Sequence, residues 1–488
     1  MKNLYLMILF VAASAMLSGQ MTLTWSPAIN VAGGTVYGTS WPRIALTAND
    51  IPVVSWGNKN TKKLYVSRLN GAAFTTPVKV TPGNSEGFVA DWAGPDIGAW
   101  GDSVFCAYKS SPETPGYNYI VRSTDGGMTF SDSIRADNFA PDRSRFPAVD
   151  VLPGGNPVIS FMRFDSTWSA PEYEVMQSMD GGQTFQQPVP ASNAAPGEVC
   201  DCCPADIRIY GNTWLLPFRN NDVNIRDSWT AISNNSGNSF DTIARMDTSN
   251  WNIAMCPSQA ADAAMKGDSL ISVWTTAASG AYKVWLSAMD TSSLILAIHQ
   301  PIDTSVNATQ RKARMVARGD TMGLVWEDNR TNDYDIYLAW NIGSIRGLSG
   351  IPELAVETQA GMQQNPDVIF RNGVFHIVFH DMGTNQVVYR SATITSPAGN
   401  TGDDLFQNAQ IIPNPASDRM TIRFGGKWNE SIAIRIQDLQ GRIMSGQFVN
   451  PVGGSSEIEL DIAGLPSSVY VVELASGNDV LRRKLVKQ

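Results

Sequence analysis

Two short apolar stretches, separated by a turn that usually contains glycine, recur along most of the chain. The second stretch of each unit ends in an aromatic residue, and successive units begin 52 to 57 residues apart. A period of this size with short alternating strands is typical of a β-propeller, in which each unit forms one four-stranded blade. The first stretches begin at Pro42, Pro95, Pro147, Pro204, Ala261, Ala313 and Pro366. The pattern therefore predicts an all-β fold, a seven-bladed β-propeller followed by a small antiparallel β-sandwich domain.

The seventh unit lacks an outer strand of its own after Val387–Arg390. The segment Leu23–Ile29, near the start of the chain, resembles the outer strands of other units. We expect it to complete the seventh blade, which would lock the ring and leave no open sheet edge between the first and last blades.

The two ends of the chain differ from the repeated part. Residues 1–19 combine Lys2 with an apolar run too short to span a bilayer, as in a secretory signal peptide. The propeller is expected over residues 20–397, a polar linker over 398–408, and a domain of short alternating strands over 409–488. No transmembrane segment is expected in the mature chain.

Composition limits the choice of partner. The 488 residues carry a formal net charge of −9, and only 17% of them are charged. Nucleic-acid binding is not expected, because it requires a basic face that releases phosphate counterions. No cofactor is expected either.

The last domain carries four short motifs that resemble one family. Their pattern is similar to the type A sorting domain of the type IX secretion system, and the likeness spans residues 409–488. The motifs are Pro413-Asn414-Pro415, Asp438–Arg442, Tyr470–Val472 and Lys484–Val486. The resemblance implies that the type IX machinery is a partner, and that a Gram-negative bacterium secretes the protein or displays it on its outer surface.

Three turns inside the blades share a Ser-x-Asp-x-Gly-x-Thr-Phe pattern. They contain Asp125 and Asp180, and Asn235 takes the place of the aspartate in the third turn. The carboxylate can accept backbone N–H groups across the turn, and the glycines adopt backbone angles that other residues avoid. The motifs resemble the Asp boxes of sialidase-like (BNR) propellers, where the resemblance implies a structural role on the face opposite the chemistry.

Loops that enter the first strand of a blade share one rim with loops that leave its second strand. Several arginines converge there, and planar guanidinium groups suit a carboxylate or sulfate. Ordinary surface ion pairs are the alternative explanation. The candidate ligand-binding residues are Arg143, Arg145, Arg163, Asp165, Arg219, Asn221, Arg226 and Asp227.

Resemblance to sialidases raises the question of catalysis. Arg145-Phe146-Pro147 is similar to an Arg-Ile-Pro stretch of that family. The sialidase family, however, has six blades, and no late tyrosine with a partnering glutamate and arginine is found on this rim. The catalytic residues are therefore unknown, and we expect binding of an extracellular glycan or other anionic ligand. An exo-sialidase-like glycoside hydrolase acting on extracellular glycans is the alternative.

Four cysteines are predicted to meet where the fourth and fifth blades begin. They are Cys200, Cys202, Cys203 and Cys256, whereas Cys106 lies inside an apolar strand of the second blade. An exported chain meets oxidising conditions, so disulfides are the first expectation, with three possible pairings. A thiolate site for copper(I) or zinc is the sharper alternative, which would make the chain a metal-binding surface protein; free thiols remain the third possibility.

Overall fold

A computed structural model describes most of the chain. The described residues are 21–114, 116–137, 143–303, 307–343, 353–357, 360–395, 410–423, 432–438, 442–449, 457–476 and 479–488. The predicted signal peptide, residues 1–19, and the predicted linker, 398–408, lie outside them. Leu23–Ile394 form one compact unit, and the described residues from 410 onward belong to another.

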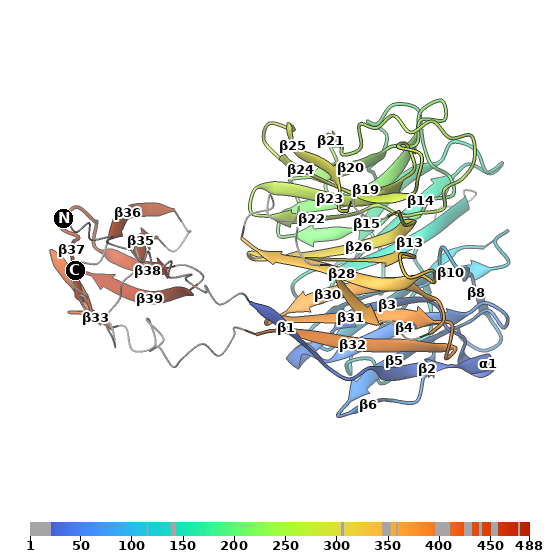
Figure 1. Cartoon of the computed structure of the whole chain (residues 1–488), viewed down its shortest axis with the longest axis horizontal. Coiled ribbons are helices and arrows are strands. Elements are labelled where there is room, and N and C mark those ends of the chain that lie inside the picture. The colour runs from blue at the N-terminus through green and yellow to red at the C-terminus, as the bar shows by residue number, and fades with distance from the viewer. Residues whose placement is uncertain are drawn as a thin grey trace, which may run out of the picture. The chain divides into compact units, whose positions relative to one another are not determined.

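The larger unit contains seven antiparallel sheets in its described residues (Figure 1). The first three sheets in chain order cover β3 to β16. Their strands are β3 (Ser40–Leu46), β4 (Pro52–Asn58), β5 (Lys63–Asn70), β6 (Ala73–Phe74) and β7 (Val78–Lys79); β8 (Glu86–Gly87), β9 (Asp96–Trp100), β10 (Ser103–Ser111), β11 (Asn118–Ser123) and β12 (Ile134–Arg135); and β13 (Arg143–Val151), β14 (Pro157–Phe164), β15 (Glu172–Gln177) and β16 (Val189–Pro190).

The fourth, fifth and sixth sheets follow the same plan. Their strands are β17 (Glu198–Val199), β18 (Arg208–Tyr210), β19 (Thr213–Asn221), β20 (Ser228–Ser233) and β21 (Thr242–Arg245); β22 (Asp262–Lys266), β23 (Ser269–Thr276), β24 (Lys283–Asp290) and β25 (Leu296–Pro301); and β26 (Gln310–Arg318), β27 (Thr321–Asp328), β28 (Asp335–Ile342) and β29 (Leu354–Glu357).

The seventh sheet joins the two ends of the unit. It contains β30 (Gln363–Arg371), β31 (Val374–Asp381) and β32 (Gln386–Thr395), with β1 (Thr22–Trp25) and β2 (Ile29–Gly33) both paired to β32. Figure 1 shows the blue β1 beside the orange β32. The prediction that the start of the chain completes the seventh blade is confirmed. The short helix α1 (Gly34–Tyr37) connects β2 to β3 of the first blade, and the 3-10 turn η1 (Ala48–Asp50) connects β3 to β4 within that blade.

The innermost strands close a ring. Each of β3, β9, β13, β18, β22, β26 and β30 contacts the next, and β30 contacts β3. The sheets are therefore the blades of a β-propeller, and the predicted all-β propeller is confirmed. The aromatic residue that ends each repeat is buried, as the packing of one blade on its neighbours requires. These residues are Trp56, Tyr108, Phe161, Phe218, Trp274, Trp326 and Phe379.

The Asp-box turns have the hydrogen bonds that the motif predicts. Asp125 Oδ1 accepts the backbone N–H groups of Met128 and Thr129, each at 3.0 Å. Asn235 keeps one such bond, since its Oδ1 accepts the N–H of Ser239 at 3.0 Å. The Gly126 N–H donates to the carbonyl of Asp102, in the hairpin between β9 and β10. The turns thus lie at the end of the ring where first strands lead into second strands.

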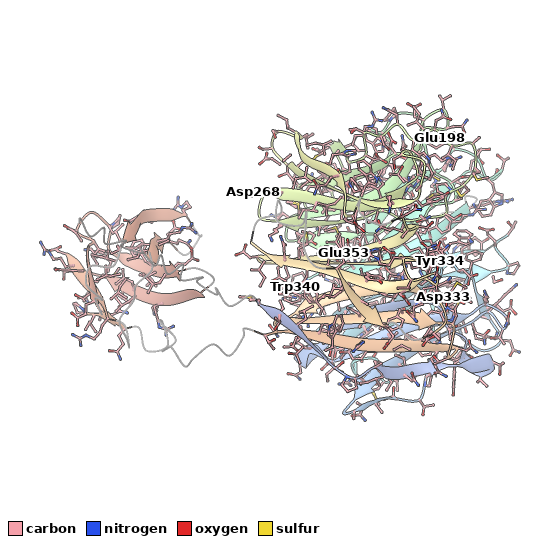
Figure 2. The ribbon with its side chains drawn as sticks, viewed as in Figure 1. Glu198, Asp268, Asp333, Tyr334, Trp340 and Glu353 are labelled. Atoms are coloured by element: carbon pink, nitrogen blue, oxygen red, sulfur yellow. A yellow bond between two sulfur atoms is a disulfide. The ribbon has the colours of Figure 1, made fainter. Side chains whose placement is uncertain are left out.

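The two faces of the ring can be told apart by their loops. We call the face where the innermost strands begin the mouth face, and the other the opposite face. In Figure 2, Glu198, Asp333 and Tyr334 lie at the mouth face, whereas Asp268 lies at the opposite face, in the hairpin between β22 and β23. The predicted ligand residues belong to strands and loops that end at the mouth face.

The smaller unit has its own core. One sheet has the order β33 (Gln410–Ile412), β34 (Arg419–Arg423), β37 (Glu457–Asp461), and the other the order β36 (Ile443–Val449), β35 (Ile432–Gln437), β38 (Ser468–Ser476), β39 (Asp479–Lys487). Ile422, Val472 and Leu485 are fully buried in the hydrophobic cluster of this unit. Among the described residues, no helix is long and apolar enough to cross a membrane.

Candidate functional site

Charged side chains surround the axis of the ring at one level. One position is equivalent in all seven blades, the residue just before Ile44, Ile97, Val149, Ile207, Ala263, Met315 and Val368. It is an arginine or aspartate in six blades and Ala148 in the third. The six residues are Arg43, Asp96, Asp206, Asp262, Arg314 and Asp367. All are buried or nearly so. We call them the axial ring.

Aspartates of the axial ring tie each blade to the next. Asp367 Oδ2 accepts the N–H of Ile44 at 3.0 Å, which joins the seventh blade to the first. Asp96 accepts the N–H of Val149 at 2.8 Å. Because these backbone groups are buried where no strand can pair with them, each carboxylate satisfies a donor that would otherwise cost free energy.

Arginines balance most of the negative charge of the axial ring. Arg314 contacts Asp206 and lies 3.1 Å from Asp367, and Arg208 lies 3.1 Å from Asp262. Burial, followed by the nearby charge of Asp206, raises the pKa of Asp96 to about 7. A cavity of about 340 Å³ lies beside the ring, lined by Asp96, Asp150, Arg208, Arg314 and Asp367 among others.

On the mouth face, four blades begin with the same irregularity. A β-bulge interrupts the pairing of the first two strands, and one residue in each bulge has a positive φ. These residues are Trp41, Phe146, Lys312 and Asn365, with φ between 52° and 58°. Bulges redirect side chains, and strained backbone gathers at functional sites. Here the four side chains line two hollows of only about 30 and 20 Å³, so the centre of the face is shallow.

Beside this centre, cations gather around one indole ring. Trp168 lies in the loop after β14, and its ring has the Arg145 guanidinium at 4.4 Å, that of Arg143 at 5.1 Å and the Lys109 ammonium at 5.9 Å. Phe164 contacts Trp168 edge to face at 5.2 Å. Burial lowers the pKa of Lys109 to about 8, so it still carries its charge at neutral pH. We call Lys109, Arg143, Arg145, Phe164 and Trp168 the Trp168 patch.

Two other predicted residues of the third blade have partners of their own. Arg163 is paired with the buried Glu174 at 2.8 Å. Asp165 accepts the N–H groups of Thr167 and Ser169, and these bonds, beginning with that from Ser169, lower its pKa. Asp165 therefore stabilises the turn that carries Trp168.

In the fourth blade, three of the four candidate ligand residues are buried. Arg219 is fully buried and donates to the carbonyl groups of Arg226 and Thr275. Arg226 and Asp227 are also buried, and Asp227 pairs with Arg245. Asn221 lies at the end of β19 and accepts the N–H of Asn224 at 3.2 Å. The strands end at the mouth face as expected, but the neighbouring blade covers their arginines.

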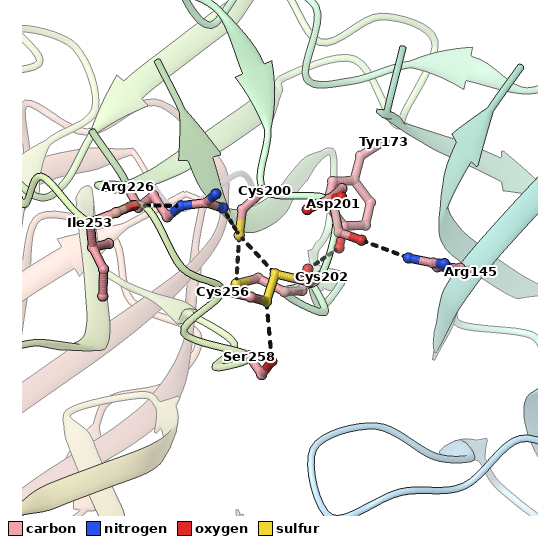
Figure 3. Close-up of a disulfide and its surroundings, with 10 residues drawn as sticks. Arg145, Tyr173, Cys200, Asp201, Cys202, Arg226, Ile253, Cys256 and Ser258 are labelled. Atoms are coloured by element: carbon pink, nitrogen blue, oxygen red, sulfur yellow. Dashed lines mark hydrogen bonds between the residues drawn. A yellow bond between two sulfur atoms is a disulfide. The ribbon is translucent and has the colours of Figure 1, made fainter. Parts of the chain in front are cut away.

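The four cysteines meet on the mouth face, as predicted. Cys202 and Cys256 form a disulfide that links the fourth and fifth blades (Figure 3). Cys200 and Cys203 are buried thiols, and the ligand atoms of all four cysteines lie within 4.8 Å of one another. The disulfide that the sequence led us to expect first is thus found for one pair of these cysteines. Cys106 is buried in the core of the second blade.

Two carboxylates near the mouth pair with cations. Glu327 is buried and contacts Arg311 and Lys312, and Glu113 contacts Arg145. Tyr389, the late tyrosine of the ring, is buried against His376. Glu198, Asp201 and Asp333 are exposed carboxylates of the mouth face.

Comparison with known families identifies the last domain. Residues 410–488 match the family model described as the secretion system C-terminal sorting domain. The predicted sorting domain is confirmed, and it indicates export across the outer membrane. No curated protein matches the chain.

Several solved structures are similar in fold. An ulvan lyase of family PL25, bound to -[GlcA(1-4)Rha3S]-, is 10% identical over 74% of this chain and 94% of its own, with a TM-score of 0.51. A protein of unknown function from Dyadobacter fermentans is 12% identical (76% and 99% covered, TM-score 0.47), and a Trypanosoma rangeli sialidase with the inhibitor DANA is 11% identical (92% and 84% covered, TM-score 0.42). At 10% identity the likeness to the ulvan lyase concerns the fold alone.

Sequence reasoning missed two features. The axial ring had a signal, a charged residue that recurs just before the apolar run of the innermost strands, as in Pro95-Asp96-Ile97 and Pro366-Asp367-Val368. Trp168 also had a signal, since it is a large aromatic residue in a polar loop directly after two candidate residues of the same blade, Arg163 and Asp165.

Proposed function

We propose that this exported propeller binds an anionic glycan on its mouth face, at the Trp168 patch. The observation that carries the proposal is the grouping of three cations within 6 Å of one indole ring. An indole packs against the C–H face of a sugar ring, and guanidinium groups bind carboxylate or sulfate with paired hydrogen bonds.

Shape supports binding across the face. The hollows at the centre of the mouth are far smaller than the several hundred Å³ of an enclosed small-molecule site. A polysaccharide lying over the surface would need no such pocket. The PL25 ulvan lyase, which shares the fold, was solved with a glycan that carries both a uronate and a sulfated sugar, and this is the ligand class we propose.

Binding is preferred to hydrolysis because three carboxylates near the mouth, including the two closest to the Arg145 and Arg163 guanidinium groups, are held in ion pairs. Glu113 and Glu327 are engaged with cations, and Glu174 is buried beside Arg163. A general acid and its partner would need a free carboxyl group on each side of the scissile bond.

Affinity electrophoresis in gels that contain alginate, chondroitin sulfate or neutral dextran tests the proposal. We expect the full-length protein to be retarded by at least one acidic polysaccharide and not by dextran. R143A and W168A should each weaken that binding about tenfold to a hundredfold, the effect of a lost charge-assisted contact. The matched control is R318A, because Arg318 is an exposed arginine at the opposite face.

Two results would overturn this assignment. The first is no retardation by any acidic polysaccharide, and the second is equal weakening by R318A and R143A. Release of reducing ends from the retarding polysaccharide, if R143A abolished it, would establish the hydrolase instead.

A further inference from the structure

We propose that the four cysteines of the mouth face form a thiol–disulfide relay. In this relay Cys200 attacks Cys202 of the Cys202–Cys256 disulfide, and Cys203 then displaces Cys202. The relay is a second activity, separate from glycan binding, and its partners are thiols and disulfides outside the cell.

Distances place the sulfur atoms for exchange. Cys200 Sγ lies 3.5 Å from Cys202 Sγ and 2.8 Å from Cys203 Sγ. A thiol this close to a disulfide is within reach of it, and exchange requires it to turn into line with the S–S bond. Cys200 is therefore placed as the attacking thiol, Cys202 as the sulfur atom attacked, and Cys203 as the thiol that completes the exchange.

Two buried guanidinium groups favour a negative charge at Cys200. Arg226 Nη1 donates to Cys200 Sγ at 3.0 Å (Figure 3), and Arg219 is fully buried close by. Arg219 also acts on the buried Asp247, whose pKa its charge helps to lower. A thiolate at Cys200 would add a negative charge beside both guanidinium groups.

The two buried cysteines differ in the way that a relay requires. The hydrogen bond with Cys203, together with the charges of Arg219 and Arg226, lowers the pKa of Cys200 to about 7. Burial raises the pKa of Cys203 well above its usual value. Cys200 is thus the attacking thiolate at neutral pH, and Cys203 keeps its proton until the second step.

The exchange balances within the chain. In the first step a bond forms between the sulfur atoms of Cys200 and Cys202, the Cys202–Cys256 bond breaks, and its electron pair and a proton go to Cys256. In the second step Cys203 loses its proton and bonds to Cys200, and the electron pair of the Cys200–Cys202 bond goes to Cys202, which is then protonated. The four cysteines thus form one disulfide and two thiols both before and after the exchange.

Exchange moves a dithiol from the interior to the surface. Cys256 is exposed and lies 3.1 Å from the Ser258 hydroxyl group, and Cys202 is half-buried. Once free, these two thiols can reduce a disulfide outside the protein. That disulfide becomes two thiols, and Cys202 and Cys256 are oxidised again, which leaves the protein with two disulfides.

Mapping of the sulfur atoms in the full-length chain tests the relay. The protein is purified without reductant, quenched in acid, alkylated under denaturing conditions, digested and analysed by mass spectrometry. In C203S the second step cannot occur, so we expect a Cys200–Cys202 bond and an alkylated Cys256 in most molecules. In the wild type, one equivalent of a phosphine added to the fully oxidised protein should leave Cys200–Cys203 and Cys202–Cys256 molecules that interconvert with time. Cys106 is the internal control, because it should be alkylated in every sample.

Arg226 is a positioning residue, and its role has its own readout. In R226Q the exchange rate should rise to its plateau at a pH about one unit higher than in the wild type, while R226K should restore most of the shift. Loss of the thiolate at pH 7 would slow exchange about tenfold.

The relay is refuted if C203S holds only the Cys202–Cys256 bond with Cys200 alkylated, and if phosphine-treated wild type shows no interconversion. It is also refuted if the purified wild type carries a stoichiometric metal ion on four thiolates and no disulfide. The wild-type experiment gives an answer even where C203S fails to fold.

Discussion

Asp96 should make the propeller less stable as the pH rises through neutrality. It is buried in the axial ring, where it accepts the N–H of Val149 at 2.8 Å. Burial and the charge of Asp206 raise its pKa to about 7, against 3.8 for the ordinary group. The substitution D96N keeps an oxygen acceptor for Val149 and removes the titration.

The sign follows from proton linkage. Between pH 4 and 7 the folded protein holds a proton on Asp96 that the unfolded chain has released, so stability falls as the pH rises. Its stabilising contribution is complete below pH 4 and is lost as the pH passes through the folded pKa. A difference of about three units corresponds to roughly 4 kcal/mol, of which roughly 3 kcal/mol falls between pH 5 and 8.

Calorimetric melting of the wild type and D96N from pH 5 to 8 measures this term. A unit of about 370 residues has an unfolding entropy of roughly 0.8 kcal/mol per degree, so 3 kcal/mol corresponds to roughly 4 °C. Between pH 5 and 8 we expect the melting temperature of D96N to rise by roughly 4 °C relative to that of the wild type. Other titrating groups cancel in the difference between the two proteins.

A suitable control is Asp180, whose pKa is held below its usual range by hydrogen bonds from Thr184 and Ser178. It does not titrate in this window, so D180N should melt in parallel with the wild type from pH 5 to 8. If the D96N and wild-type curves are also parallel, Asp96 is ionised in the folded protein and the account of the axial ring is wrong.

Three further predictions concern the ring and its export. R314M removes the cation that contacts Asp206 and Asp367 and should cost about 3–5 kcal/mol, seen as a melting temperature lower by roughly 4–6 °C; an unchanged melting temperature would contradict the ion-pair network. D180A removes the acceptor of the Gln183 and Thr184 N–H groups and should lower the free energy of unfolding by about 1–2 kcal/mol, seen as a lower urea midpoint with an unchanged slope. A changed slope would mean a broader loss of structure. Deletion of residues 410–488 should leave the melting temperature of the ring unchanged. Cell fractionation should find the truncated protein retained on the inner side of the outer membrane, and its secretion would contradict the role of the sorting domain.

Periodicity was enough to predict the propeller and its closure, because both depend on which residues alternate. The start of the chain pairs with β32 as expected, since Thr22–Trp25 is an alternating segment without another partner. The disulfide pairing could not be predicted in the same way. Three pairings of four nearby cysteines satisfy the sequence equally, and only the loop conformations select Cys202–Cys256.

Burial on the mouth face was the weakest part of the prediction. Arg143 and Arg219 both lie at strand ends on that face. Arg143 remains partly exposed beside Trp168. Arg219 is covered by the fifth blade, where the Thr275 carbonyl accepts its hydrogen bond. Which arginine faces solvent depends on how far each loop extends over its neighbour. Strand periodicity carries no information on that distance.

The two proposed activities share one loop. Asp201 lies between Cys200 and Cys202, and its carbonyl accepts a hydrogen bond from Arg145 at 3.2 Å (Figure 3). Arg145 in turn lies over the ring of Trp168. When Cys200 and Cys202 exchange disulfide partners, the backbone of Asp201 between them is held differently. Arg145 would then shift with the Asp201 carbonyl to which it donates. The sulfur chemistry and the Trp168 patch are therefore connected through a single backbone carbonyl, which links the disulfide pairing of the cysteines to the proposed glycan-binding surface.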